Sequence, residues 1–397
     1  MDDSWTTAVV FSHLRWDFVY ERPQQVFSRL GARRRILFVE EPVHDPGGSP
    51  RWERRVAAPN VIVHRPYTPV AAEGFAEAQL PVLARLVRRL RTRHRDERLL
   101  AWLYTPLALP LARLLDPVHV VYDCMDELSA SLHAPPETGE REQALLGYAD
   151  VVFTAGPSLH GAKMAQREDV YCLPSSVDAE HFARARRGRL REAADQARLP
   201  HPRLGFYGVL DERIDGPLLA AVADARPDWQ LVMVGPVANI APESLPQRPN
   251  IHYLGARAYR DLPAYLSGWD VCLLPFARNA ATRCISPTQT LEYMAAERPI
   301  VGTPITDVAE PYGHIVYLGD TPAGFVAACE RALGARQAER TARTAAMRTV
   351  RSRTSWDATV RTMEELIAAL PPARRTEGGS ATWGADRSSS TAPARQA

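Results

Sequence analysis

The sequence predicts an α/β protein built from two doubly wound domains. Short apolar runs alternate with helix-like segments along most of the chain, and they form two series. The first series comprises 8–11, 36–39, 61–63, 100–103, 119–122, 151–154 and 170–173, and the second comprises 204–207, 231–234, 251–254, 271–274, 300–301 and 315–318. Continuous apolar strands that alternate with helices indicate parallel strands covered on both faces. Two such series indicate two Rossmann-like domains that face a central cleft.

The composition changes along the chain and predicts the domain limits. We expect an N-terminal domain over 1–186, a linker over 187–202 and a C-terminal domain over 203–354. The linker is charged, lacks a strand signal and ends in prolines. A further helix is predicted over 355–370, where apolar periodicity follows a serine cap. Residues 371–397 are rich in Arg, Ser, Gly, Thr and Ala, and we expect them to be disordered.

The overall composition excludes several classes of protein. The hydrophobic fraction of 46% and charged fraction of 24% are typical of globular proteins, and a net charge of +2 gives no support for nucleic-acid binding. Lys163 is the only lysine among 48 basic residues, which nearly removes Schiff-base chemistry and a pyridoxal-type sugar phosphorylase. The five cysteines form no Cys-x-x-Cys pair, so we expect neither a zinc site nor a disulfide framework. With no signal peptide or spanning segment in the sequence, we expect a cytoplasmic protein.

The stretch CISPTQTLEYMAAERPIVGTP (284–304) predicts a helix start directly after a strand and a loop. Ser286 followed by Pro287 is a helix-start signal, and the unpaired amides of such a start attract anions. Arg283 adds positive charge. Glu292, one turn further in, would repel a phosphate but could accept hydrogen bonds from a ribose diol. This stretch alone fits a nucleoside diphosphate site and, about equally, a surface cap beside a solvated glutamate.

The loop after the first strand, SHLRWDFVYERPQQVFSRL, is a second candidate ligand segment. We expect Arg15, Arg22 and Gln24 to contact a phosphate or an acceptor, because arginine binds phosphate bidentately. Trp16 could cover a sugar ring. The alternative is that Trp16 belongs to the core and that Arg22 forms a structural ion pair.

Several stretches resemble, in the same order, the retaining GT-B glycosyltransferases of family 4. The stretch 286–304 resembles their donor-binding helix; ADVVFTAGPSLHGAKM (149–164), VYCLPSSVDAEHF (170–182) and RLGFYGVLDERID (203–215) continue the match. The resemblance covers nearly all of the chain to about residue 370. Two further stretches, LRWDFVYERPQQVFSRL and VYDCMDELSA, look most similar to bacterial cell-wall and exopolysaccharide enzymes of the teichuronic-acid type.

The resemblance implies the GT-B fold and transfer of a sugar from a nucleotide-diphosphate sugar to a hydroxyl acceptor. It implies retention of configuration, with no metal and no cofactor beyond the nucleotide-sugar co-substrate. Glu292 would bind the ribose, and the loop 256–259 would read the base through its backbone amides. The candidate catalytic residues are Asp126, Arg213 and Arg283. The candidate donor-binding residues are Glu292, Ser286, Pro287, Thr288, Gln289, Thr290, Arg257 and Tyr259.

Two positions depart from the family pattern and keep alternatives open. Cys284 stands where the family has the glutamate that contacts the donor sugar, and Met125 stands where it has a catalytic-region histidine. The alternatives are a nucleotide-sugar epimerase of the same fold and a non-catalytic nucleotide-sugar-binding subunit.

The segment 80–95 predicts an amphipathic helix with leucines on one side and arginines on the other. We favour packing on the sheet with a solvated arginine face. The alternative is a peripheral contact with the inner face of a membrane.

Overall fold

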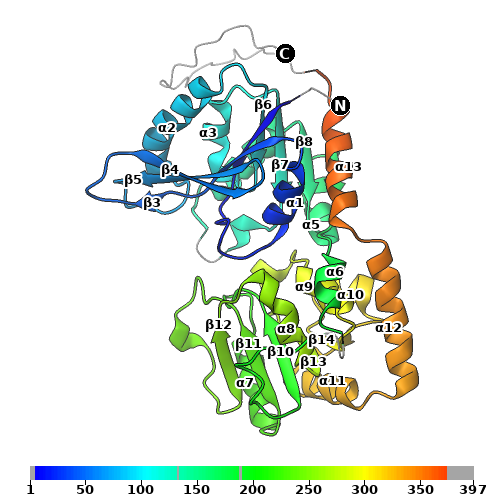
Figure 1. Ribbon diagram of the computed structural model, residues 1–397. Coiled ribbons are helices and arrows are strands. Elements are labelled where there is room, and N and C mark those ends of the chain that lie inside the picture. The colour runs from blue at the N-terminus through cyan, green and yellow to red at the C-terminus, as the bar shows by residue number, and fades with distance from the viewer. Residues whose placement is uncertain (1–4, 132–133, 187–189, 373–397) are drawn as a thin grey trace, which may run out of the picture.

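The computed structural model describes residues 5–131, 134–186 and 190–372. Figure 1 shows two α/β units, one above the other, with the last two helices running along one side of both. Each unit is built on its own sheet, so the predicted fold class is confirmed. The predicted disorder of 371–397 falls almost entirely outside the described residues.

The first sheet has nine strands in the order β3-β5-β2-β1-β6-β7-β8-β9, with β4 paired to β5. The strands are β1 (Thr7–Phe11), β2 (Arg35–Val39), β3 (Val43–His44), β4 (Arg51–Ala58), β5 (Val61–Thr68), β6 (Leu99–Leu103), β7 (His119–Cys124), β8 (Val151–Thr154) and β9 (Val170–Cys172). All seven predicted runs are strands. The sequence did not predict β3 or β4, and β4 is antiparallel to β5. Because β4 (RWERRVAA) is largely exposed, it lacks the apolar run that marks a buried strand.

The second sheet is fully parallel, in the order β12-β11-β10-β13-β14-β15. Its strands are β10 (Arg203–Tyr207), β11 (Gln230–Val234), β12 (Ile251–Gly255), β13 (Val271–Leu274), β14 (Ile300–Gly302) and β15 (Tyr317–Leu318). All six predicted runs are strands. In each sheet the strand order reverses beside one strand, β1 in the first and β10 in the second. Ligands of such sheets bind at the carboxyl ends of the strands beside this reversal.

Helices cover both faces of the sheets. They are α1 (Arg22–Leu30), α2 (Leu80–Arg93), α3 (Leu109–Arg113), α4 (Thr138–Tyr148), α5 (Pro157–Met164), α6 (Ala179–Ala183), α7 (Gly216–Ala225), α8 (Leu262–Ser267), α9 (Thr288–Ala295), α10 (Thr306–Tyr312), α11 (Pro322–Gly334), α12 (Gln337–Ser352) and α13 (Trp356–Ala368). Short 3₁₀ turns include η3 (Leu128–Ala130), η5 (Tyr259–Asp261) and η6 (Ala280–Thr282). Alternate residues of β1 enter the cores on opposite faces of the first sheet, Val9 on one and Val10 on the other.

The C-terminal helix α13 packs against the first domain. Trp356, Val360 and Met363 are buried in the same cluster as Phe27 of α1. Arg29 of α1 lies 2.8 Å from the carboxylate of Asp357. The chain therefore returns to the N-terminal domain after completing the second sheet, as Figure 1 shows.

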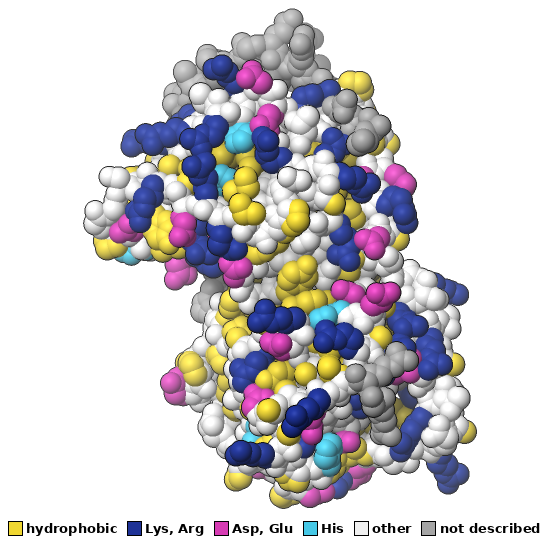
Figure 2. All heavy atoms as spheres, in the orientation of Figure 1, with side chains coloured by type: hydrophobic (Ala, Val, Ile, Leu, Met, Phe, Trp, Pro, Cys, Tyr) yellow, Lys and Arg dark blue, Asp and Glu magenta, His cyan; other side chains and the backbone are white. Residues whose placement is uncertain are grey.

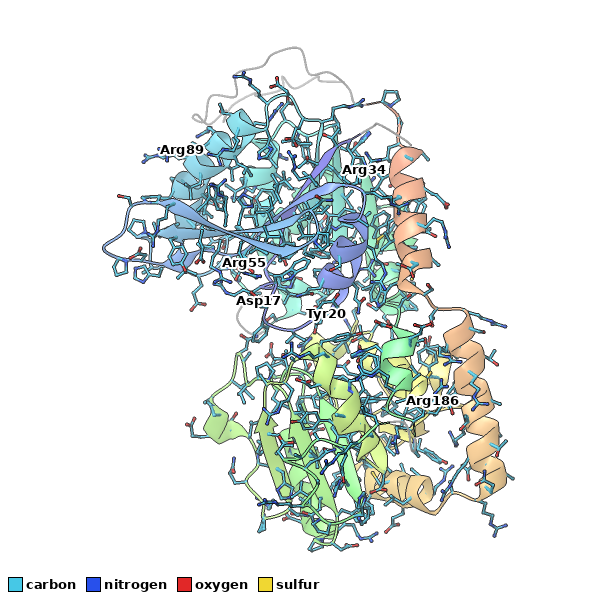
Figure 3. All side chains as sticks on the ribbon, in the orientation of Figure 1. Asp17, Tyr20, Arg34, Arg55, Arg89 and Arg186 are labelled. Carbon is cyan, nitrogen blue, oxygen red and sulfur yellow. The ribbon has the colours of Figure 1, made fainter. Side chains whose placement is uncertain are left out.

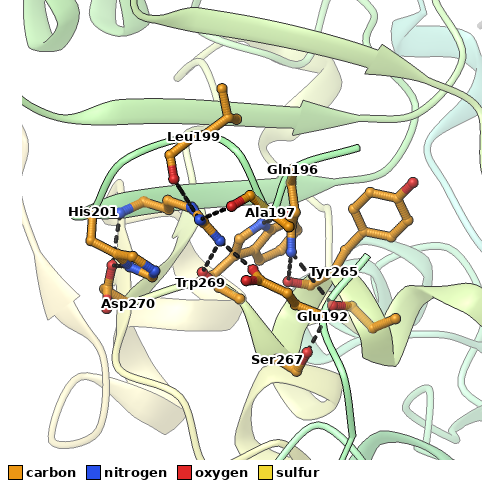
Figure 4. Close-up of polar contacts among 12 residues, drawn as sticks. Glu192, Gln196, Ala197, Leu199, His201, Tyr265, Ser267, Trp269 and Asp270 are labelled. Atoms are coloured by element: carbon orange, nitrogen blue, oxygen red, sulfur yellow. Dashed lines mark hydrogen bonds and ion pairs between the residues drawn. The ribbon is translucent and has the colours of Figure 1, made fainter. Parts of the chain in front are cut away.

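The segment between the two sheets packs on the second one. Phe182 of α6 is fully buried in the second core. Gln196 Nε2 donates to the Tyr265 carbonyl at 2.9 Å, and Trp269 Nε1 donates to Gln196 Oε1 at 3.0 Å (Figure 4). His201 Nδ1 lies 2.6 Å from Asp270 Oδ2. By its packing, this segment belongs with the C-terminal domain, while the predicted limits of the domains stay a prediction.

Helix α2 has the amphipathic arrangement that its sequence predicts. Its buried residues are Leu80, Leu83, Leu86, Val87 and Leu90. Arg85, Arg88 and Arg89 are exposed on the other side. None of the helices in the described part of the chain has the length and apolar character needed to span a bilayer.

Candidate functional site

A cavity of about 460 Å³ lies between the two domains. The N-terminal domain contributes His13, Leu14, Arg15, Phe18, Val19, Glu21, Glu41, Asp126, Glu127, Leu128 and Ser131, and the C-terminal domain contributes Val209, Asp211, Glu212, Arg213, Ala238, Asn239 and Ala281. Most of these residues lie in loops that follow β1, β2, β7, β10 and β11. The cavity is therefore at the carboxyl ends of both sheets, where this fold places its ligands. A second cavity of about 380 Å³, lined by residues of α11 and α12, lies away from these strand ends.

The start of α9 differs from the prediction in one respect. Ser286 is not the cap: the N-cap position is Pro287, and no side chain caps the helix. The Ser286 side chain instead lies against Gly156 and Asp307. Proline has no amide hydrogen, and the Thr290 amide donates to the Pro287 carbonyl at 3.1 Å. The amides of Thr288 and Gln289 are therefore the uncapped donors at this helix start.

Glu292 is buried in the interior rather than solvated, so the surface-glutamate alternative is wrong. Its side chain is 9% exposed, and the Tyr207 hydroxyl donates to Glu292 Oε2 at 2.5 Å. Burial raises the pKa of Glu292 to about 8; the Tyr207 hydrogen bond opposes this, and the charges of Glu21 and Asp178 add to it. At neutral pH the folded protein therefore holds this carboxyl largely protonated.

Arg213 and Asp126 line the same cavity from opposite domains. Arg213 binds Asp211 through Nε and Nη2, with Nη2 2.7 Å from Oδ2. Burial alone would lower the pKa of Arg213, but Asp211, Asp126 and Glu21 raise it further above its usual value. The guanidinium therefore stays charged and is held in one orientation beside the cavity.

Arg283 is exposed at the end of η6, outside the lining of the cavity. It lies close enough to Glu127 to affect that carboxyl. Burial raises the pKa of Glu127, but the Lys163 amine, with smaller contributions from Ser129 and Arg283, lowers it overall. The neighbouring Cys284 is 6% exposed and packs in a core cluster of the first domain.

Arg257 and Tyr259 have partners that limit their roles. Arg257 Nη2 donates to Asp195 at 2.7 Å, so this guanidinium faces the segment between the sheets. The ring of Tyr259 contacts Tyr20 with centroids 4.5 Å apart and is stacked on His181 at 4.4 Å. Tyr20 lies at the edge of the N-terminal domain that faces the second domain (Figure 3). With both neighbours in place, the Tyr259 ring is not free to stack on a base.

The structure corrects the assignment of Arg22 and Gln24 to ligand binding. Arg22 is fully buried, with Nη2 2.9 Å from Asp123 Oδ1, as in the ion-pair alternative. Gln24 is 1% exposed and donates to the Trp16 carbonyl at 2.7 Å. Trp16 is a core residue. Among the predicted residues of this loop, only Arg15 lines the cavity.

Six titratable cavity residues were not singled out from the sequence. They are His13, Glu21, Glu41, Glu127, Asp211 and Glu212. Burial raises the pKa of Glu21 to about 7 and that of Glu41 to about 7. His13 and Glu41 each follow the end of a strand by two residues. That position was a usable signal, because the carboxyl ends of strands bear the ligand site in this fold.

The two domains also meet where α5 begins. Asp307 of α10 accepts hydrogen bonds from the backbone amide of Ser158, at 3.0 Å, and from its hydroxyl. A Cβ added at Gly156 would meet the Asp307 carboxylate and would lie 2.6 Å from Ser286 Cβ. The close approach of the domains therefore depends on a glycine at 156.

We expect Gly156→Ala to destabilise the protein by about 1–3 kcal/mol, because neither neighbour can move without disturbing the domain contact. Gly161→Ala on the same helix is the matched control, since nothing lies within 4 Å of its added Cβ. That variant should be neutral or more stable by about 0.5–1 kcal/mol. Chemical denaturation measures both, and equal stability of the two variants would contradict the close approach.

Comparisons with known proteins agree with this geometry. Residues 201–335 match the family model of the glycosyl transferases group 1. TuaH of Bacillus subtilis (strain 168), which is named as a teichuronic acid biosynthesis glycosyltransferase, is 27% identical over 265 residues. The alignment covers 60% of this chain and 64% of TuaH, so it spans less than two thirds of that relative.

Solved structures share the fold over nearly the whole chain. Sucrose-phosphate synthase from Thermosynechococcus elongatus has a TM-score of 0.69 at 16% identity, covering 92% of this chain and 99% of that one. The E. coli trehalose-6-phosphate structure bound with UDP-2-fluoro glucose has a TM-score of 0.67 at 14% identity, covering 92% and 100%. Anabaena HepE in complex with UDP and glucose has a TM-score of 0.63 at 14% identity, covering 91% and 99%.

The two sheets have the GT-B fold that the solved structures share, with the cavity between the carboxyl ends of their strands. Residues 201–335 of its C-terminal domain are similar to the group 1 glycosyltransferases.

Proposed function

We propose that this protein is a retaining glycosyltransferase that moves a sugar from a nucleotide-diphosphate sugar to a hydroxyl acceptor. The observation that carries the proposal is the cavity between the strand ends, which Arg213 lines from the domain that matches group 1. The uncapped amides of α9 and the charge of Arg283 add donors for a diphosphate. Glu292 is proposed to bind the ribose once the nucleotide is present.

In the proposed reaction, the bond between the anomeric carbon and the diphosphate oxygen breaks. The acceptor hydroxyl oxygen bonds to the same face of that carbon, and its proton passes to the departing diphosphate. Arg213, Arg283 and the amides of Thr288 and Gln289 stabilise the charge that develops on the diphosphate. Donors fixed in this way contribute about 3–4 kcal/mol each when measured by their removal. Asp126, on the opposite wall of the cavity, is proposed to orient the sugar or the acceptor.

The similarity to TuaH supports an acceptor from cell-wall or exopolysaccharide synthesis. The neighbours that contain UDP or a UDP-sugar analogue make UDP-glucose the first donor to test. We propose that the protein works in the cytoplasm with the exposed arginines of α2 in solvent. A peripheral contact of these arginines with anionic lipid head groups stays the alternative. Figure 2 shows basic side chains over this part of the N-terminal domain, and Figure 3 places Arg89 on its outer side.

A thermal-shift panel of UDP, GDP, ADP, dTDP and their hexose conjugates tests the donor site. A ligand at 100 times its Kd should stabilise the wild type by about 2.7 kcal/mol. We expect one nucleotide to stabilise the wild type and to lose most of its effect on Glu292→Ala. Glu310→Ala is the matched control, because Glu310 is an exposed glutamate of α10. A folded wild type that no ligand stabilises would remove the donor-site proposal.

A non-catalytic nucleotide-sugar-binding subunit is the second candidate. Cys284 is buried against the first domain instead of providing a carboxylate, and Met125 packs partly against the core. Binding alone does not separate this candidate from an enzyme. Release of nucleotide from the bound nucleotide sugar, with water or an added acceptor, would favour the enzyme. Conversion to another nucleotide sugar without an acceptor would favour an epimerase.

A further inference from the structure

His13 occupies the cavity wall at the carboxyl end of β1, two residues after Phe11. Its Nδ1 atom is buried and has no hydrogen-bond partner within the part of the chain that the structure describes. Burial lowers the pKa of His13, and Arg213 adds to this, while Asp126 and a hydrogen bond to the Tyr104 backbone oppose it. The imidazole is therefore neutral near pH 7. Its single N–H is taken by the Tyr104 backbone, which leaves the unpartnered nitrogen as an acceptor.

Three other histidine nitrogens in the described part of the chain have partners. His64 Nδ1 lies 3.2 Å from the Ile62 carbonyl, and His160 Nε2 lies 3.1 Å from the Val170 carbonyl. His181 Nε2 lies 2.9 Å from the Tyr259 carbonyl. A buried polar atom without a partner costs about 1–3 kcal/mol. Such atoms are rare in folded proteins, and an approaching ligand is one explanation for them.

The surroundings of His13 favour a hydroxyl as that ligand. Glu21, Asp126 and Arg213 line the same cavity and interact electrostatically with one another, and Asp126 and Arg213 also act on His13. A neutral imidazole adds no positive charge for a phosphate, which Arg213 supplies. Its unpartnered nitrogen can accept a hydrogen bond from a sugar hydroxyl. The sugar must lie beside the diphosphate, and His13 lies near Arg213 on the facing wall.

We propose that His13 Nδ1 hydrogen-bonds a hydroxyl of the transferred sugar and so distinguishes the nucleotide sugar from the nucleotide alone. This inference rests on the proposed function and adds to it a residue that contacts the donor sugar. It makes His13 a determinant of sugar binding rather than of nucleotide binding.

Calorimetric titration of a nucleotide and its sugar conjugate tests the inference. UDP and UDP-glucose are the first pair, followed by any other pair that stabilises the wild type in the panel. We expect His13→Ala to bind the sugar conjugate about 3–10 times more weakly, as for the loss of one neutral hydrogen bond. Its affinity for the nucleotide alone should stay within about twofold of the wild type, since no nucleotide contact is removed.

Two isosteric variants test which imidazole nitrogen of His13 contacts the sugar. His13→Asn places an amide atom where Nδ1 lies, and His13→Gln places one near Nε2. We expect the asparagine variant to keep most of the affinity for the sugar conjugate and the glutamine variant to resemble alanine. His64→Ala is the matched control, because it removes a buried imidazole of the same domain that does not line the cavity. In His64→Ala, the ratio of the affinity for the sugar conjugate to the affinity for the nucleotide should equal the wild-type ratio.

Other results of these titrations would overturn the proposal or the assignment of the nitrogen. The proposal is wrong if His13→Ala leaves the ratio of the two affinities unchanged. If both affinities fall equally, His13 has a structural role. Rescue by glutamine and not by asparagine would overturn the assignment of Nδ1. If the alanine variant does not fold, the asparagine and glutamine variants decide. If the wild type binds none of these pairs, the proposed function is wrong and this inference is wrong with it.

Discussion

Replacing Arg22 by methionine is expected to destabilise the protein by about 3–5 kcal/mol, because it leaves a buried carboxylate without its partner. Both side chains of the Arg22–Asp123 pair are 0% exposed. Arg22 Nε lies 3.0 Å from Asp123 Oδ1, and Arg22 Nη1 donates to the Leu173 carbonyl at 2.7 Å. Urea denaturation measures the change, through the midpoint at an unchanged slope.

Two further variants distinguish the loss of the buried Arg22–Asp123 ion pair from the general effect of losing an arginine. Arg33→Met removes an ion pair with Glu364 in which the arginine is 58% exposed, so it should cost less than about 1 kcal/mol. Combining Arg22→Met with Asp123→Leu should recover much of the stability, because no buried charge is left unpaired. Equal costs for Arg22→Met and Arg33→Met would refute the structural role of Arg22.

The stability of Glu292→Gln relative to the wild type is expected to rise by about 2–4 kcal/mol between pH 4.5 and pH 8. The pKa of Glu292 is raised to about 8 in the folded protein, chiefly by burial, from an ordinary value of 4.5. Over this interval the unfolded chain loses the proton while the folded protein keeps it. The stability contribution of this group is therefore complete below pH 4.5 and is lost as the pH rises towards 8. Glutamine does not titrate, so the variant avoids this loss.

Urea denaturation of both proteins at several pH values measures this difference. Glu310→Gln, at an exposed site, should follow the wild type across the range. A difference that stays flat or falls with rising pH would contradict the raised pKa. The same substitution should weaken nucleotide binding, because the proposed ribose contact uses both carboxyl oxygens and the amide keeps only one oxygen. A residue that costs stability in the unliganded protein and is needed for binding is typical of a ligand site.

The fold followed from local patterns because buried parallel strands are apolar along their whole length. Every strand predicted in this way is present, and so is the amphipathic helix α2. The sequence did not predict strand β4, because this strand is an exposed antiparallel neighbour of β5 and carries charged residues. The helix start at α9 was placed within two residues, but its cap was misassigned because Ser286 lies against Gly156 and Asp307 instead.

The sequence by itself determined the two-domain α/β architecture and the loops that reach the cleft, since both depend on short-range patterns of apolar and turn residues. Only the tertiary structure decided which side chains of those loops face a ligand. Arg22 and Arg15 look equally suitable in the sequence, yet Arg22 is held by Asp123, 101 residues away, and Arg15 lines the cavity. Burial, partners and pKa shifts arise from residues that are distant in the chain and meet only on folding. The exposed or buried state of Arg22, His13 and Glu292 could therefore be read only from the folded protein.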